Sequence, residues 1–125
     1  MDDDGIARNL DGTVWKNPLR GWNNMPPKKA KETGVEISMR IPGNTDCWRK
    51  TRNNFNRDNA PYHWHKVTGD FEVVCKISGN LVSMYDKAGL MVRLDETQWI
   101  MTGMEFFNNQ MNHSTCITKD HTDWS

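Results

Sequence analysis

Apolar and polar residues alternate along much of this chain, and no other feature constrains its fold as strongly. In the run VEISMRI at residues 35–41 every second residue is apolar, as in a strand with one buried face. No window of about eleven residues or more carries the apolar stripe of an amphipathic helix, which repeats every 3.6 residues. The chain is therefore predicted to be all-β.

Turn residues divide the rest of the chain into further segments that favour strands. Two hairpins are predicted, one around Asp95-Glu96-Thr97 and one around Asn108-Asn109-Gln110. Strands at regular spacing with Gly, Asn and Pro between them are typical of a β-sandwich or jelly roll. The predicted strands after the first are residues 46–51, 71–77, 90–94, 99–107 and 114–118.

Length and charge limit the classes of function. A chain of 125 residues has the length of one ordinary domain, and a single domain over residues 1–125 is predicted. Sixteen Lys and Arg balance sixteen Asp and Glu, so no bulk charge favours nucleic acid or an anionic membrane as a partner. The basic run at residues 28–31 is short, follows two prolines and lacks interleaved aromatics, which indicates a solvated loop.

The sequence also bears on the compartment. No apolar run approaches the roughly 20 residues of a membrane helix, and the start of the chain lacks the basic and apolar regions of a signal peptide. A cytoplasmic protein is therefore expected. Cys47, Cys75 and Cys116 are odd in number and lack CxxC spacing, so we expect reduced, half-buried thiols rather than a disulfide framework or a zinc knuckle.

Five segments occur in an order and spacing that are specific in combination, although each is weak alone. They are TDCWR at 45–49, GDFEV at 69–73, YDKAGLMVR at 85–93, WIMTGMEF at 99–106 and TDWS at 122–125. On these segments the chain resembles the regulation-of-enolase family, catalogued as domain of unknown function 1349, in the concanavalin A-like lectin and glucanase superfamily. The resemblance runs from about Trp15 to the last residue.

The resemblance implies a jelly-roll sandwich of two antiparallel sheets, one of them concave. The family's name also suggests a regulatory link to enolase and glycolysis. Two positions depart from the family's pattern, because Lys87 stands where the family usually has Gln and Met101 where it usually has Lys. Family members continue for several strands beyond the Asp-Trp-Ser motif, so the domain is expected to be C-terminally incomplete.

Aromatic and charged residues in the predicted strands suggest a ligand-binding face. Every second residue of a strand shares a face, which groups Asp46 with Trp48 and Trp99 with Glu105. If these faces coincide, flat aromatic rings are surrounded by charged hydrogen-bonding groups, as in sugar-binding sites. The candidate ligand-binding residues are Asp46, Trp48, Asp86, Arg93, Trp99 and Glu105.

Structural roles are an open alternative for the same residues. The tryptophans also suit a core, and Arg93 suits an ion pair with Glu105. Asp86 precedes a predicted strand, where an aspartate often caps a turn.

The only spacing that suits a metal is His63-Trp64-His65, because two histidines at i and i+2 of a strand face the same way. Glu72 lies too far along the chain to complete a cupin-type site, so a loop that packs Trp64 onto a sheet is preferred. No metal and no cofactor are expected.

Catalytic groups are not evident in the sequence. Retaining glucanases need two carboxyl groups about 5 to 5.5 Å apart, and the Glu-x-Asp-x-x-Glu pattern that supplies them on a jelly-roll strand is absent. Ser114 and His113 are adjacent, so on a strand they point to opposite faces and form no nucleophile and base pair. We expect a non-catalytic jelly-roll domain whose concave face binds a carbohydrate or similar polyhydroxyl ligand. A protein-interaction module that regulates enolase is the alternative, and a sugar-active hydrolase is a weaker one.

Overall fold

The structure, a computed structural model, describes residues 20–24, 30–32 and 36–125. These residues form antiparallel strands, turns and bends, and no helix lies among them. The predicted all-β class is confirmed. Two compact units are present, one within Met1–Asp46 and Asn59–Val74 and the other from Cys47–Asp58 and Cys75–Ser125.

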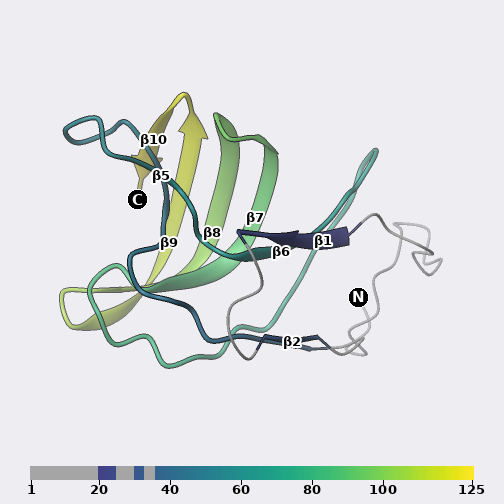
Figure 1. The fold of residues 1–125 in the computed structure, drawn as a ribbon, viewed down its shortest axis with the longest axis horizontal. Coiled ribbons are helices and arrows are strands. Elements are labelled where there is room, and N and C mark those ends of the chain that lie inside the picture. The colour runs from purple at the N-terminus through teal and green to yellow at the C-terminus, as the bar shows by residue number, and fades with distance from the viewer. Residues whose placement is uncertain (1–19, 25–29, 33–35) are drawn as a thin grey trace. The chain divides into compact units, whose positions relative to one another are not determined.

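A four-stranded antiparallel sheet dominates the second unit, and its strands follow one another along the chain (Figure 1). Its long strands, at 90–94, 99–107 and 114–118 in the sequence prediction, are confirmed. The sequence pattern does not predict the fourth strand, because its four residues contain little apolar alternation. The strands are β7 (Lys87–Asp95), β8 (Gln98–Phe107), β9 (Gln110–Lys119) and β10 (His121–Trp124), in the order β10-β9-β8-β7.

Each connection in this sheet is a short turn. Asn108 and Asn109 form the turn between β8 and β9 with φ of 50° and 61°, a left-handed conformation that asparagine tolerates. Between β7 and β8 the carboxylate of Asp95 accepts hydrogen bonds from the backbone N–H of Thr97 at 2.8 Å and from its hydroxyl at 2.7 Å. Asp120, with φ of 65°, connects β9 to β10. Both predicted hairpins are confirmed.

Two glycines face each other where β7 and β8 meet. Gly89 lies directly opposite Gly103. A β-carbon added to Gly103 would lie 2.2 Å from the carbonyl oxygen of Ala88 and 2.5 Å from the Cα of Gly89, far inside van der Waals contact. Position 103 therefore accepts only glycine unless the strands move apart.

The two faces of the sheet differ in character. Cross-strand neighbours share a face, so the registers of the strands define which side chains lie together. One face, called the apolar face below, carries rows such as Val92, Ile100 and Ile117. The other, called the polar face, consists of Lys87, Gly89, Met91, Arg93, Trp99, Met101, Gly103, Glu105, Asn112, Ser114, Cys116, Thr118, Thr122 and Trp124.

The polar face is the buried one. On this face Trp99 is only 4% exposed, and Glu105 is only 2% exposed although it carries a carboxylate. On the apolar face Leu94 is 81% exposed and Ile117 is 51% exposed. The core of the second unit thus lies over the polar face, and the apolar face forms an exposed patch.

A hairpin of β4 (Cys47–Arg49) and β5 (Asn56–Asp58) packs at the polar face, next to β10. The backbone N–H of Arg49 donates a hydrogen bond to the hydroxyl of Thr122 at 2.8 Å. The hydroxyl of Thr51 donates a hydrogen bond to the backbone carbonyl of Thr122. The strand predicted at 46–51 is therefore present in shorter form and is tied to the sheet by hydrogen bonds.

Two small antiparallel strand pairs lie among the described residues of the first unit. β1 (Arg20–Asn23) pairs with β6 (Tyr62–His65), and β2 (Lys31–Glu32) pairs with β3 (Ile37–Ser38). The prediction of a loop at His63-Trp64-His65 is wrong, because β1 supplies a hydrogen-bonding partner from much earlier in the chain. β3 covers only part of the strand predicted at 35–41, whose first residue lies outside the described residues.

The strand predicted at residues 71–77 is not formed. Phe71, Val73 and Val74 are exposed, and no described strand pairs with this segment. Alternation alone does not make a strand, because the backbone N–H and C=O groups also need a neighbouring strand. In the basic run, residues 28 and 29 lie outside the described residues, and Lys31 begins β2.

Two further expectations concern cysteines and membranes. Cys47 and Cys116 are buried, and Cys75 is exposed rather than half-buried. Within the described ranges the structure has no helix of the length and apolar character that crossing a membrane requires.

Candidate functional site

Three of the six candidate residues lie on the polar face. Arg93 of β7 is directly opposite Trp99 of β8, and Glu105 lies further along β8 on the same face. The prediction that these side chains share a face agrees with the strand register. The other three are Trp48 in β4, Asp86 immediately before β7, and Asp46, which belongs to the first unit.

Arg93 fixes the second strand of the hairpin to the sheet. Its two terminal nitrogens donate to the two carboxylate oxygens of Asp58, each at 2.7 Å. Such a bidentate pair is geometrically specific and is stronger than a single neutral hydrogen bond. The alternative pairing with Glu105 does not fit the register, because Arg93 lies opposite Trp99 and Glu105 lies opposite Lys87.

Glu105 is a buried carboxylate with two polar partners. The indole N–H of Trp124 donates to its Oε1 at 2.7 Å and also lies 3.1 Å from the hydroxyl of Ser114. The ammonium of Lys87 lies 3.7 Å from Oε2. Burial of a charge is costly unless it is paired and hydrogen-bonded, and both conditions are met here.

A hollow of about 110 Å³ opens beside Trp48 in the second unit. The indole N–H of Trp48 donates to the carbonyl of Thr51 at 2.6 Å, which holds the ring in one orientation. Arg57 is the direct cross-strand neighbour of Trp48, and its guanidinium carbon lies 5.0 Å from the centre of the Phe55 ring. The hollow is lined by Trp48, Arg49, Asn56, Arg57, Asp58 and Glu96.

The remaining candidates make structural contacts. Trp99 is buried on the polar face. Oδ2 of Asp86 accepts hydrogen bonds from the backbone N–H groups of Val82 at 3.1 Å and Ser83 at 2.9 Å, which is a turn-capping arrangement. In the first unit the backbone N–H of Asp46 donates to the side-chain oxygen of Asn59 at 2.9 Å.

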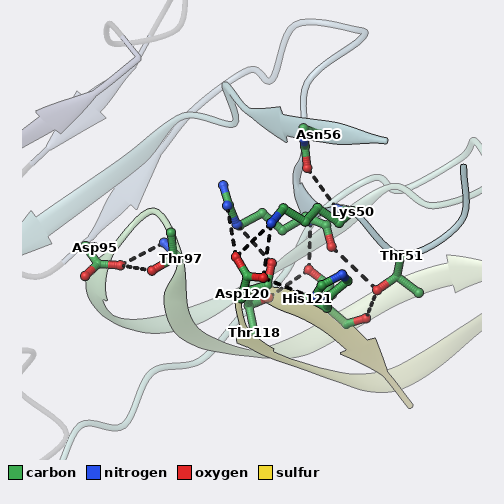
Figure 2. Close-up of polar contacts among 10 residues, drawn as sticks. Lys50, Thr51, Asn56, Asp95, Thr97, Thr118, Asp120 and His121 are labelled. Atoms are coloured by element: carbon green, nitrogen blue, oxygen red, sulfur yellow. Dashed lines mark hydrogen bonds and ion pairs between the residues drawn. The ribbon is translucent and has the colours of Figure 1, made fainter. Parts of the chain in front are cut away.

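A second polar cluster joins the hairpin to the turn between β9 and β10 (Figure 2). The ammonium of Lys50 lies 3.0 and 3.1 Å from the two carboxylate oxygens of Asp120, and Arg49 donates to Oδ1 at 3.2 Å. These hydrogen bonds lower the pKa of the Asp120 carboxyl below its ordinary value, and the hydrogen bond from Lys50 has the largest effect. The carboxylate thus offsets part of the positive charge of the hairpin.

Metal-binding groups are sparse in the part of the chain that the structure describes. It contains no group of three or more His, Cys, Asp and Glu side chains that could hold a metal ion. The rings of His63 and His65 lie 5.3 Å apart edge to face, and no third donor of this kind joins them among those residues.

Sequence reasoning missed most of the residues around the hollow. Most of them lie in the hairpin of β4 and β5, on either side of an asparagine-rich turn in which Asn53 and Asn54 have left-handed φ of 57° and 55°. That turn after a predicted strand was a usable signal, because it favours a return strand that places polar residues beside Trp48. The missed residues are Arg49, Asn56, Arg57, Asp58 and, in the turn between β7 and β8, Glu96.

Comparisons with known proteins agree with this architecture. The model of the family described as protein of unknown function (DUF1349) matches residues 22–125. "Regulation of enolase protein 1" of Saccharomyces cerevisiae is 31% identical over 104 residues, which are 83% of this chain and 52% of the relative. The chain thus spans about half the length of this curated relative.

A solved structure is also similar. It is titled "The crystal structure of a functionally unknown protein from Saccharomyces cerevisiae", and its TM-score is 0.64 at 28% sequence identity. The match covers 85% of this chain and 57% of the solved chain. From the extent of the family match and the identity with the yeast relative, the chain belongs to the DUF1349 family, as its motifs indicated.

Proposed function

We propose that this chain is a non-catalytic binding module that holds a carbohydrate or similar polyhydroxyl ligand in the hollow beside Trp48. The observation that carries the proposal is the composition of the lining, in which an aromatic ring lies among two guanidinium groups, an amide and two carboxylates. The C–H face of a sugar ring stacks on aromatic rings, while charged and amide groups exchange hydrogen bonds with its hydroxyls. The hydrogen bond from Trp48 to Thr51 holds the ring in place before the ligand arrives.

The carboxylates near this site favour binding over hydrolysis. Of the two carboxylates that line the hollow, Asp58 accepts hydrogen bonds from Arg93 at both of its oxygens, and Glu96 lies in the turn between β7 and β8. A general acid must instead carry a proton on the oxygen that faces the substrate. In this proposal Arg93 orients Asp58, one of the carboxylates that line the hollow.

Tryptophan fluorescence of the full chain, titrated with a panel of neutral and charged oligosaccharides, tests the proposal. We expect saturable quenching by one sugar class, lost in Trp48→Ala and retained in Trp64→Ala, whose tryptophan is exposed in the first unit. A near-UV circular dichroism spectrum of each variant establishes that it is folded. Folded wild-type chain that responds to no sugar in the panel would overturn the proposal.

A second function, regulation through a protein partner, is favoured by the exposed apolar face. Val92, Ile100 and Ile117 form a row across three strands, and contiguous exposed apolar surface commonly marks an interaction site. The name of the yeast relative makes enolase the partner to test first. In this proposal the two proteins meet in the cytoplasm.

Light scattering of the chain mixed with purified enolase measures this association directly. Association that is lost in Ile117→Lys and kept in Lys119→Ala, a polar position on the same strand and face, would support the regulatory function. No complex at micromolar concentrations would count against it.

A further inference from the structure

The hollow beside Trp48 lies in the most positively charged segment of the second unit. Residues 47–58 contain four cationic side chains and one carboxylate, whereas the whole chain is balanced at sixteen of each sign. The excess is not cancelled by neighbours on the sheet, because Arg93 adds another cation beside Asp58. Asp120 is shared by Arg49 and Lys50, so one carboxylate serves two cations.

Arg57 is the cation that the hollow presents to a ligand. It lines the hollow and is half-buried. Within the described ranges no carboxylate lies at ion-pair distance from its guanidinium, whose recorded neighbour is the ring of Phe55 at 5.0 Å. An aromatic ring on one side of a guanidinium leaves its in-plane N–H groups available for a carboxylate or a phosphate.

The spacing between Arg57 and Trp48 fits one sugar unit. The two residues are direct cross-strand neighbours, so their side chains leave the hairpin on the same face about 5 Å apart. A sugar ring stacked on Trp48 therefore places an exocyclic substituent within reach of Arg57. The carboxylates of Asp58 and Glu96, which also line the hollow, are acceptors for the hydroxyl groups.

We infer that the ligand of this hollow is an anionic sugar, in which one ring stacks on Trp48 and a phosphate or carboxylate group on that ring binds Arg57. The inference rests on the proposed sugar-binding function and adds the charge of the ligand to it. Glu96 opposes the anionic group, so its charge limits the affinity.

Isothermal titration calorimetry of the full chain with glucose, glucose 6-phosphate, glucuronate, inorganic phosphate and an acidic peptide, oligoglutamate, tests the inference. We expect at least one charged sugar to bind about tenfold or more tightly than glucose, as a charge-assisted hydrogen bond provides. Arg57→Gln should abolish this preference, so that the charged sugar binds this variant no more tightly than glucose does. Arg52→Gln is the matched control, since it removes a cation of the same hairpin that does not line the hollow, and the preference should remain.

The outcomes separate the inference from the proposed function. If glucose binds as tightly as both charged sugars, the inference is wrong and the sugar-binding function stands. If inorganic phosphate binds as tightly as glucose 6-phosphate while glucose does not bind, no ring is recognised and both fail. If no compound binds, or an acidic peptide such as oligoglutamate binds more tightly than every sugar, both also fail. Higher affinity for the charged sugar in Glu96→Gln would support the inference further.

Discussion

Replacing Gly103 by alanine tests the close approach of β7 and β8. The added β-carbon meets backbone atoms at 2.2 and 2.5 Å, whereas ordinary carbon contacts lie at about 3.5 to 4.0 Å. The neighbours are a carbonyl oxygen and a Cα, so no side chain can rotate away and the strands must separate by about 1 Å or more. Overpacking of this kind costs about 1 to 3 kcal/mol, and each weakened interstrand hydrogen bond costs about 0.5 to 1.5 kcal/mol.

Part of this cost is offset in the unfolded state. Alanine restricts the unfolded chain and by itself stabilises a protein by about 0.4 to 1 kcal/mol. The net prediction is therefore a loss of about 2 to 3 kcal/mol. Urea unfolding followed by tryptophan fluorescence measures it as a fall of about 1 M in the midpoint, at a slope of about 2 kcal/mol per molar urea.

Gly79→Ala is the matched control, because the nearest atom to its added β-carbon is a leucine methyl group at 4.0 Å. This variant should be neutral or slightly stabilised. A Gly103→Ala protein whose midpoint matches that of Gly79→Ala would refute the reasoning, since the clash would then be relieved without loss of pairing.

Three further predictions concern the polar contacts of the second unit. Glu105→Gln should lower the free energy of unfolding, measured by urea unfolding, by about 1 to 3 kcal/mol, because the half-buried Lys87 loses its carboxylate partner. Adding Lys87→Met to the same chain should recover part of this loss. Thr97→Val should raise the pKa of Asp95 toward its ordinary value, because the hydrogen bond from the Thr97 side chain is the largest cause that lowers this pKa. A carbon-13 NMR titration measures the pKa, and an unchanged value would exclude that cause. The folded pKa of Asp120 is lowered, chiefly by Lys50, so its contribution to stability is complete above the ordinary aspartate pKa and is lost as the pH falls through the folded value. Asp120→Asn should accordingly flatten the fall of Tm on acidification between the ordinary and the folded pKa, and an unaltered profile would contradict this assignment.

The meander β7 to β10 is largely predictable because its determinants are local. Alternation of apolar and polar residues predicts the long strands, and residues that favour turns lie between them. Asn108 adopts a left-handed conformation in one turn, and Asp95 accepts a backbone hydrogen bond in another. The pairing of β1 with β6 is not local, and neither strand has the alternation of apolar and polar residues that would predict a strand. Residues 71–77 show the converse, since their alternation is clear and no described strand pairs with them.

The candidate site was predictable only where strand periodicity determines it. The shared face of Arg93, Trp99 and Glu105 follows from positions along two neighbouring strands and their register. The partner of Arg93 does not, because Asp58 lies 35 residues away and joins it only through the packing of the hairpin. Which face is buried also could not be inferred, since polar side chains such as Glu105 can be buried once they are paired.

The sequential order of β7, β8, β9 and β10 has a consequence for how the chain folds. Each strand pairs with the next across a turn of one or two residues, so little loop-closure entropy opposes their association. In contrast, Asn23 of β1 pairs with Tyr62 of β6, which lies 39 positions further along the chain. Pulse-labelled hydrogen exchange should therefore find the amides of the meander protected first, as a folding nucleus, and those of β1 and β6 protected later.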